Sequence, residues 1–267
     1  MTQPSITNDT RLSRRQASPV LELRNLRTAF PGREAPVTVV NDVSLTLARG
    51  ETLAVVGESG SGKTMTFLSA LGLLPVGGRV VGGEARLGDQ DLLKLRPKEL
   101  RAVRGDKISM VFQDPLSGLN PVFRVGEQIA DAIRAHRSIS RAEARQEVIR
   151  LLERVHIPDP KRRIENYPHE LSGGMRQRVL IAMAIALDPL VLVADEPTTA
   201  LDVTIQAQIL ELLGEIQADT GMGLVLITHD LGLVARHADR VAVMYAGRVV
   251  EQGNLDAIFK RTRHPYT

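Results

Sequence analysis

The stretch Leu53-Ala54-Val55-Val56-Gly57-Glu58-Ser59-Gly60-Ser61-Gly62-Lys63-Thr64 joins a short apolar run to a glycine-rich loop. Four consecutive apolar residues predict a strand that is buried on both faces of a sheet. The loop fits the pattern G-x-x-x-x-G-K-[ST], in which a helix begins near the lysine. A buried strand, a glycine loop and a helix in this order predict an α/β fold.

The residue types in this loop suit a polyphosphate. Glycines let the backbone curl so that several N–H groups point at phosphate oxygens, and a helix N-terminus adds positive partial charge. The lysine neutralises the outer phosphates, and the hydroxyl after it is placed to bind Mg²⁺. We predict nucleotide binding by Gly57, Glu58, Ser59, Gly60, Ser61, Gly62, Lys63 and Thr64. The loop alone does not distinguish a kinase from a GTPase or a motor.

Two carboxylates follow a second apolar run. Leu190–Ala194 is typical of a buried strand and is followed by Asp195 and Glu196. A parallel strand delivers its C-terminal residues to the crevice where ligands bind, and successive side chains point opposite ways, so the two acids should differ in role. Asp195 is predicted to hold Mg²⁺ through its water shell, and Glu196 to orient and polarise the attacking water.

His229 follows a third apolar run, Leu224–Ile227. A lone histidine after a strand is usually an ordinary polar loop residue. Because this one follows the next candidate strand of the sheet, we predict that it hydrogen-bonds the γ-phosphate and senses which nucleotide is bound.

A second glycine segment, Leu171-Ser172-Gly173-Gly174-Met175-Arg176-Gln177-Arg178, lies far from the first along the chain. Ser172 is expected to cap a helix that starts in the glycines, whose open N–H groups and dipole favour an anion. One chain has no obvious need for two such surfaces around one γ-phosphate. We therefore predict that two chains pack head to tail and that each closes the site of the other.

The rest of the chain alternates strand and helix patterns. Strands are expected at Val20–Phe30, Val43–Leu47, Ile108–Phe112, Val241–Tyr245 and Arg248–Glu251, helices at about 174–187 and 205–217, and a loop at Gly77–Gly83. This order predicts a mostly parallel core sheet with an antiparallel β edge subdomain. A helical insertion is predicted at about 114–172, with Ser140 as an N-cap. We expect a disordered tail at 1–19 and one domain at 20–267.

Composition limits the alternatives. The 267 residues include no cysteine, which excludes disulfides and thiolate metal sites and fits a reducing compartment. Aromatic residues make up 3%, so stacking on single-stranded nucleic acid is a poor first hypothesis. The net charge is +3 without a dense Lys/Arg run, which favours a solvated surface over one built for a phosphate polymer. No apolar stretch is long enough to cross a bilayer.

The order of these motifs, with Gln113 after the strand at Ile108–Phe112, resembles the nucleotide-binding domain of ABC ATPases, which are P-loop NTPases. The resemblance covers nearly the whole chain from Val20 and implies ATP and Mg²⁺ as cofactors. It implies a signature segment that contacts the ATP of a partner, and a D-loop that crosses the dimer. The signature residues are Leu171, Ser172, Gly173, Gly174 and Gln177, and the D-loop residues are Ala200, Leu201 and Asp202.

The same resemblance assigns further roles. Gln113 is implied to couple the nucleotide to a membrane partner. The implied catalytic residues are Gln113, Glu196 and His229. The implied metal ligands are Thr64, Gln113 and Asp195. Phe30 is the candidate for stacking on adenine, although a core position at a strand end explains it equally well.

A finer resemblance is to the dipeptide/oligopeptide importer branch. It depends on Gln113-Asp114-Pro115 with Leu119-Asn120-Pro121, on Leu171–Arg178, on Leu201-Asp202-Val203-Thr204, and on Arg263-His264-Pro265-Tyr266-Thr267. Gly118 stands where the branch commonly has Ser. The branch usually continues well past His-Pro-Tyr-Thr, so we expect its C-terminal tail to be absent here. Related nickel and glutathione importers share these motifs, which leaves the substrate open.

The resemblance thus implies an ATP-hydrolysing subunit of a peptide importer, peripheral on the cytoplasmic face of the cell membrane. The implied partners are a second ABC ATPase subunit of the same or different sequence, two integral-membrane permeases and, indirectly, an extracytoplasmic solute-binding protein. No nucleic-acid partner is expected. An ABC ATPase that acts on nucleic acid is a rival, but it would carry zinc cysteines or long coiled-coil insertions. Translation-associated ABC proteins usually have two cassettes, and Leu171–Gln177 opposes a non-ABC P-loop enzyme.

Overall fold

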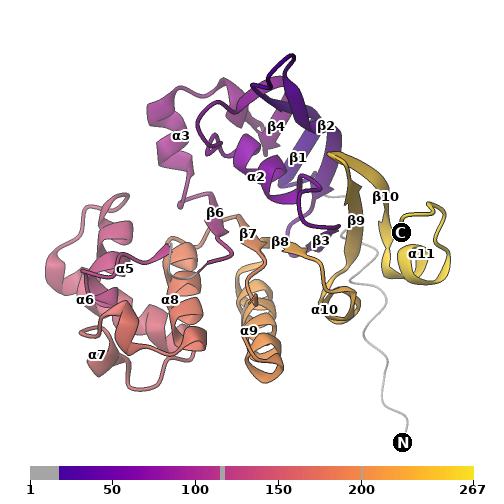
Figure 1. The fold of residues 1–267 in the computed structure, drawn as a ribbon. Coiled ribbons are helices and arrows are strands. Elements are labelled where there is room, and N and C mark those ends of the chain that lie inside the picture. Colours follow the sequence, from indigo (N-terminus) through magenta and orange to yellow (C-terminus); the bar gives the residue numbers. More distant parts are fainter. Residues whose placement is uncertain (1–17, 115–117, 200) are drawn as a thin grey trace, which may run out of the picture.

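A six-stranded sheet forms the centre of the computed structural model, which describes residues 18–114, 118–199 and 201–267 (Figure 1). Its strands, in spatial order, are β10 (Arg248–Asn254), β9 (Arg240–Tyr245), β3 (Thr52–Val56), β8 (Gly223–Thr228), β7 (Val191–Asp195) and β6 (Ile108–Val111). The five strands from β9 to β6 are parallel, and β10 is antiparallel to β9. The predicted mostly parallel core sheet is confirmed.

Alternate residues of the central strands enter two different cores. In β8, Leu224 and Leu226 pack with buried side chains of the helices between residues 125 and 216. Val225 and Ile227 pack instead with residues of the smaller antiparallel sheet. Such burial stabilises a protein by about 1.5–3 kcal/mol per side chain relative to exposure. The sheet is therefore fixed from both faces, which makes its carboxyl edge a rigid platform.

A four-stranded antiparallel sheet packs on one side of this platform. Its order is β2 (Val37–Leu47), β1 (Leu21–Phe30), β4 (Arg79–Leu87) and β5 (Gln90–Asp91). The alternation predicted for β2 is confirmed, because Val43, Leu45 and Leu47 are buried while Ser44 is exposed. This sheet is the predicted antiparallel edge subdomain.

The expectation of a loop at Gly77–Gly83 is wrong, since β4 begins at Arg79. The strand contains a register shift against β1, and Gly83 sits there with φ of 92°. A Cβ on Gly83 would lie 2.5 Å from the Asn25 carbonyl oxygen. The glycine thus marks a bulge where two backbones approach closely, a feature that resembles a loop in sequence.

Helices cover the sheet and extend to one side of it, as Figure 1 shows for α8 and α9 below the strands and α5, α6 and α7 beside them. The helices of the described residues are α2 (Lys63–Ala70), α3 (Pro97–Val103), α5 (Val125–Arg134), α6 (Arg141–Arg154), α7 (Pro160–Arg163), α8 (Gly173–Ile185), α9 (Val203–Thr220), α10 (Leu231–His237) and α11 (Leu255–Lys260), with 3₁₀ turns at Leu92–Lys94 and Pro168–Glu170. The helix predicted at 205–217 is thus longer at both ends.

The region between β6 and α8 is helical, as expected. Ser140 caps α6 in a reciprocal box, because its hydroxyl accepts from Glu143 N at 3.2 Å and the Glu143 carboxylate accepts from Ser140 N at 2.8 Å. Val148, Leu151 and Leu152 of this helix are buried in the same core as α8. The subdomain limits of about 114–172 stay a prediction, and the predicted tail at 1–19 falls almost entirely outside the described residues.

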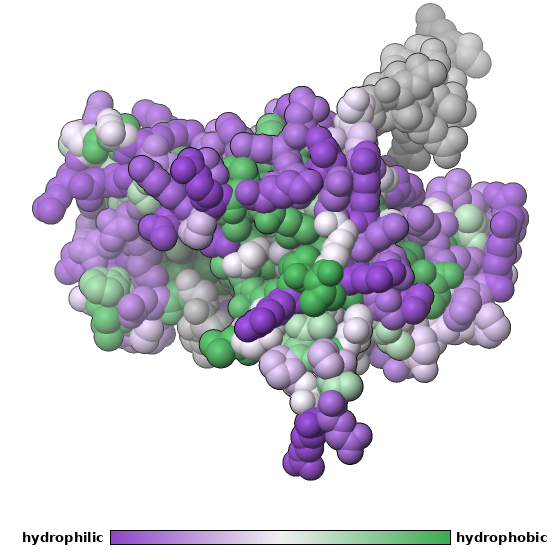
Figure 2. All heavy atoms as spheres, turned by 90° about the horizontal axis from the view of Figure 1, so that it is seen from above, coloured by the Kyte–Doolittle hydropathy of each residue, from purple (hydrophilic) through white to green (hydrophobic). Residues whose placement is uncertain are grey.

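The face seen from above is hydrophilic over most of its area, with hydrophobic residues gathered near its middle (Figure 2). Exposed large apolar side chains include Val76, Val81 and Val37. Among the described residues, no helix combines the length and apolar character that crossing a membrane requires.

Candidate nucleotide-binding and hydrolysis site

The predicted site residues come together at one edge of the large sheet. The glycine loop follows β3, His229 follows β8, Asp195 ends β7 with Glu196 directly after it, and Gln113 follows β6. These four strands are neighbours and parallel, so their carboxyl ends open into one crevice. Topology alone therefore collects residues that are far apart in sequence.

The glycine loop takes a backbone path that its glycines make possible. Gly57, Gly60 and Gly62 have φ values of 153°, 78° and 98°. A Cβ on Gly57 would lie 2.2 Å from the Met244 carbonyl oxygen, and one on Gly62 would lie 2.7 Å from that of Val39. The loop is thus pressed between β9 and β2, and its curled N–H groups are available to an anion.

Lys63 begins α2 and curls its side chain back over the loop. Its Nζ donates to the carbonyl oxygens of Gly57 at 2.7 Å and Glu58 at 2.9 Å. Burial lowers the pKa of the Lys63 ammonium, and the nearby carboxylates of Glu196 and Asp195 raise it in opposition. A partly desolvated cation inside a ring of backbone is an effective partner for phosphate oxygens.

A buried hydroxyl shows that the loop fits a polar ligand. Ser61 is 5% exposed, and its Oγ has no hydrogen-bond partner among the described residues. An unsatisfied buried hydroxyl is costly unless a ligand or water completes it. Together with the curled glycines and Lys63, this donor set fits the phosphates of ATP.

Thr64 and Asp195 form the next contact. The Thr64 hydroxyl donates to Asp195 Oδ1 at 3.0 Å, joining α2 to the end of β7. Burial raises the pKa of the Asp195 carboxyl, and the Thr64 hydrogen bond and Lys63 lower it while Glu196 raises it further. A buried carboxylate beside a hydroxyl is an oxygen pair that suits Mg²⁺ and its water shell.

Glu196 is the centre of a second set of contacts. Its carboxylate accepts from Gln113 Nε2 at 2.9 Å and from the Thr199 hydroxyl at 2.8 Å, and it lies 3.2 Å from His229 Nδ1. Its backbone has φ of 44°, a left-handed conformation that is uncommon for glutamate and concentrates at functional sites. A hydrogen bond from Glu196 N to the Ile227 carbonyl oxygen, 2.9 Å long, holds this turn.

The acid pair therefore divides as predicted from its sequence position. Asp195 is buried and faces Thr64, whereas Glu196 turns toward Gln113 and His229. A carboxylate held by several donors at a sheet edge can orient a water molecule and accept its proton. Gln113 contacts Glu196 and no bond joins it to Thr64 or Asp195 in the described residues, so its role as a metal ligand stays a prediction.

Thr199 is a residue whose contact the sequence did not reveal. In sequence it opens the segment Thr199-Ala200-Leu201-Asp202, which resembles the D-loop, but its hydroxyl contacts Glu196. The tight turn from Glu196 to Thr199, closed by a 3.1 Å backbone bond, makes the contact possible. A hydroxyl three residues after a catalytic acid is the signal that would have found it.

The second glycine segment starts helix α8 as predicted. Ser172 is the N-cap, and its hydroxyl accepts from Met175 N at 3.3 Å. Ser172 and Gly173 are exposed, whereas Gln177 is 1% exposed and Leu171 is buried. The start of this turn is therefore open to solvent, whereas Gln177 and Leu171 point into the interior, and the signature role of these residues stays a prediction.

Leu201, one of the predicted D-loop residues, lies against this turn. A Cβ on Gly173 would be 3.3 Å from a Leu201 methyl, and one on Gly174 would be 2.8 Å from an Ile205 methyl. Asp202 caps α9 by accepting from Ile205 N at 3.0 Å. Ala200 lies outside the described residues, so nothing is said of its place. The signature turn and the start of α9 thus form one continuous surface.

Phe30 ends β1 and is partly exposed. Its ring lies against Gly78, where an added Cβ would be 2.6 Å from Cζ. This contact with the segment after α2 accounts for part of its burial. The adenine role of Phe30 stays a prediction.

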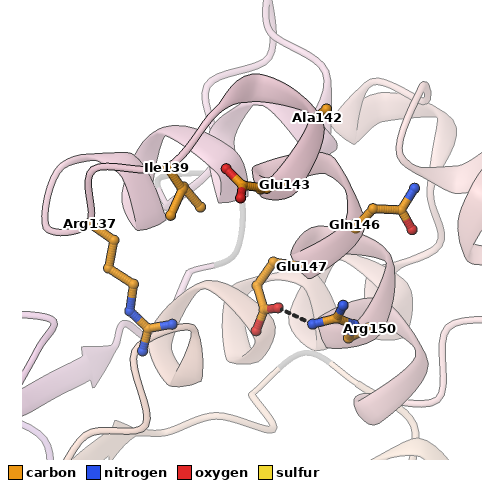
Figure 3. Close-up of a pocket in the computed structure, with 7 residues that line it drawn as sticks. All are labelled: Arg137, Ile139, Ala142, Glu143, Gln146, Glu147 and Arg150. Carbon is orange, nitrogen blue, oxygen red and sulfur yellow. Dashed lines mark hydrogen bonds and ion pairs between the residues drawn. The ribbon is translucent and has the colours of Figure 1, made fainter.

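The hollows on the helical side lie apart from this edge. One hollow, of about 430 Å³, is lined by residues from Arg137 to Arg150, and these include the Glu147–Arg150 ion pair (Figure 3). It contains neither a glycine loop nor a group that continues the Glu196 contacts.

Known proteins share these features. Residues 40–199 match the family described as ABC transporter. The chain is 50% identical over 256 residues to a putative peptide import ATP-binding protein of Brucella ovis, covering 93% of this chain and 75% of that protein. It is 52% identical over 249 residues to a dipeptide transport ATP-binding protein of Bacillus subtilis, covering 93% and 74% respectively.

The fold is also similar to a solved dimeric ATP-binding cassette in a post-hydrolysis state, bound to ADP and Pi. That likeness has a TM-score of 0.78 and 29% identity, and it covers 88% of this chain and 98% of the other. The family match includes the glycine loop, the signature turn and the acid pair described above. By sequence and by fold, this chain belongs to the ABC transporter family, as one of its ATP-binding domains.

Proposed function

We propose that this chain binds ATP with Mg²⁺ and hydrolyses it to energise the import of dipeptides or oligopeptides. The observation that carries the proposal is the meeting of the Lys63 loop, the Thr64–Asp195 pair and the Glu196 contacts at one sheet edge. Two relatives whose names state peptide import or dipeptide transport support the choice of cargo.

The residues around Lys63 would hold the nucleotide. The loop N–H groups, the Ser61 hydroxyl and the Lys63 ammonium suit the phosphate oxygens, and Thr64 and Asp195 suit the metal. The described residues hold no group of three or more His, Cys, Asp or Glu side chains arranged for a metal. Mg²⁺ in this setting shares its ligands with phosphate and water, and it supplies charge neutralisation on the phosphate oxygens.

Glu196 would act on the attacking water. Thr199 and Gln113 hold its carboxylate in place, and the carboxylate orients the water and accepts its proton. His229 lies on the other oxygen of the same carboxylate and is exposed, so it is free to contact the γ-phosphate. Hydrolysis then depends on groups from three neighbouring strands that move little relative to one another.

A second ABC ATPase subunit, of the same or a related sequence, would complete the site. Ser172 and Gly173 are exposed at the start of helix α8, where its N–H groups are free to bind an anion, whereas Lys63 is bonded to its own loop. Head-to-tail packing would bring this turn onto the phosphates bound by the partner. Closure and separation of such a pair would drive the transport cycle.

The membrane partners would meet the surface beside Gln113. Phe112, which precedes Gln113 in the chain, is 41% exposed, and Val122 and Phe123 farther along the chain are 70% and 52% exposed. A hollow of about 520 Å³ continues from Phe123 between α5 and α6. Exposed apolar side chains beside a hollow are typical of a docking surface for another protein. Two permeases on the cytoplasmic face of the membrane, with a solute-binding protein beyond them, are the proposed assembly.

Reconstitution tests the function. Proteoliposomes that contain the permeases and this subunit should take up labelled dipeptide only with MgATP, and the Glu196→Gln variant should not support uptake. Uptake of nickel or glutathione in place of peptide would contradict the proposed cargo and leave the proposed ATPase activity unchanged. A wild-type chain that neither binds nor hydrolyses MgATP would overturn the proposal altogether.

A further inference from the structure

The motif Arg263-His264-Pro265-Tyr266-Thr267 has no role in the site as described so far, yet it folds back onto the sheet. The carboxylate of Glu251, in β10, accepts from Arg263 N at 2.9 Å and from His264 N at 3.1 Å. The imidazole Nδ1 of His264 accepts from Tyr266 N at 3.2 Å. These bonds fix the course of the segment and aim the Tyr266 side chain.

Tyr266 reaches the phosphate-binding loop. Its hydroxyl accepts a hydrogen bond from Glu58 N at 3.0 Å. Its ring lies on that of Tyr245, with centroids 4.5 Å apart and planes inclined by 45°. Tyr245 ends β9, the strand beside β3, so the tyrosine pair rests on the same edge from which the loop rises.

Glu58 is consequently held on both sides of its backbone. Its N–H is bound to Tyr266, and its carbonyl accepts from Lys63 Nζ at 2.9 Å. The peptide plane that precedes Glu58 carries the Gly57 carbonyl, which also accepts from Lys63, at 2.7 Å. One hydroxyl therefore fixes the orientation of the backbone that holds the loop cation.

We propose that Tyr266 is a positioning residue for the phosphate-binding loop. Its hydroxyl holds the Glu58 peptide so that Lys63 and the loop N–H groups keep the arrangement that accepts a polyphosphate. This inference depends on the proposed nucleotide binding, which it deepens. The segment at 263–267 would thus connect the phosphate-binding loop, through Tyr266, to Glu251 in β10.

The experiment compares two single-atom deletions. Tyr266→Phe removes the hydroxyl and keeps the ring, whereas the matched control Tyr245→Phe leaves the bond to Glu58 intact. For both we would measure MgATP affinity, kcat and KM, and deuterium uptake of the peptide that contains Gly57–Lys63. We expect Tyr266→Phe to weaken MgATP binding about three- to tenfold, as loss of one hydrogen bond allows. Its kcat should stay within about twofold, because the groups around Glu196 are untouched.

Deuterium uptake separates this role from simple packing. In Tyr266→Phe the loop peptide should exchange faster without nucleotide, while Tyr245→Phe should match the wild type. A second variant, Glu251→Ala, releases the anchor of the segment and should change affinity and exchange in the same direction. Unchanged affinity and exchange in Tyr266→Phe, or an equal loss in Tyr245→Phe, would overturn the inference. A wild-type chain that fails to bind MgATP would instead contradict the proposed function.

Discussion

The beginnings of helices α2 and α8 are both glycine-rich, yet they are built differently. At α2, Gly62 takes a left-handed conformation with no side-chain cap, and the Lys63 side chain is buried against its own loop. At α8, Ser172 caps its own helix in the ordinary extended conformation and is exposed. The first lies beside Asp195, which accepts from Thr64, whereas no hydrogen bond among the described residues joins Ser172 to Asp195 or Glu196.

The difference indicates which half of a site each helix supplies. The α2 end has a cation, an unsatisfied buried hydroxyl and a carboxylate pair, so it can bind and act on a nucleotide. The α8 end can only offer N–H groups and partial positive charge to an anion that another surface holds. Changes at α2 should therefore affect binding and chemistry, and changes at α8 should affect closure.

The largest effect is expected from Glu196→Gln. The amide keeps the shape but cannot accept a proton, so hydrolysis should fall by about 10²–10⁴-fold. MgATP affinity should stay within about twofold, because the phosphate loop is unchanged. Steady-state hydrolysis and nucleotide titration measure the two quantities. The exposed Glu153→Gln is the control, and full hydrolysis by Glu196→Gln would refute the role of the acid.

Gly173→Asp tests the α8 side of the comparison. A carboxylate at this exposed turn would repel a partner's phosphates, and hydrolysis should fall roughly a hundred- to a thousandfold, in the range seen when an anion-stabilising group is lost. MgATP affinity of the isolated chain should not change. Gly214→Asp, in α9, is a matched control because an added Cβ there meets nothing within 4 Å. Loss of MgATP affinity in Gly173→Asp would contradict the division of roles.

Ser172→Ala and Ser140→Ala separate capping from function. Both hydroxyls cap a helix, so each variant should lose about 1 kcal/mol of unfolding free energy. For a chain of this size that is a fall in Tm of about 2–4 °C. Only Ser172→Ala should also lower hydrolysis, since α6 lies outside the site. Equal hydrolysis in both variants would mean that Ser172 acts only as a cap.

The smallest effect on stability is expected from Asp195→Asn, a slight rise in Tm at neutral pH in the absence of nucleotide. Burial raises the pKa of Asp195, so the charged form destabilises the fold above that pKa. As the pH falls through the raised pKa, wild-type Asp195 gains its proton and the difference in Tm should shrink. Thermal unfolding at several pH values measures it, and a gap that widens toward acid pH would contradict the direction of the shift.

Much of the α2 side could be predicted from sequence because its determinants are local. Strand, glycine loop and lysine are consecutive, and the strand ends at Asp195 and His229 converge wherever the strands are parallel. The contacts of Thr199 and Tyr266 could not be predicted, since each depends on a turn or a chain course that no periodicity encodes. The loop expected at Gly77–Gly83 is wrong for a related reason, because a glycine in a strand bulge and a glycine in a loop look alike in sequence.

The central claim is that the Lys63 loop of one chain and the Ser172 turn of another make one site. Mixing Lys63→Ala with Gly173→Asp tests it directly, because each variant alone is expected to hydrolyse ATP at only a small fraction of the wild-type rate. In a mixed dimer one of the two sites has an intact loop and an intact turn. Random pairing of equal amounts makes about half of the dimers mixed, so hydrolysis by the mixture should recover to about a quarter of the wild-type level. No recovery, with both variants folded and paired, would mean that the turn does not act on the nucleotide of its partner.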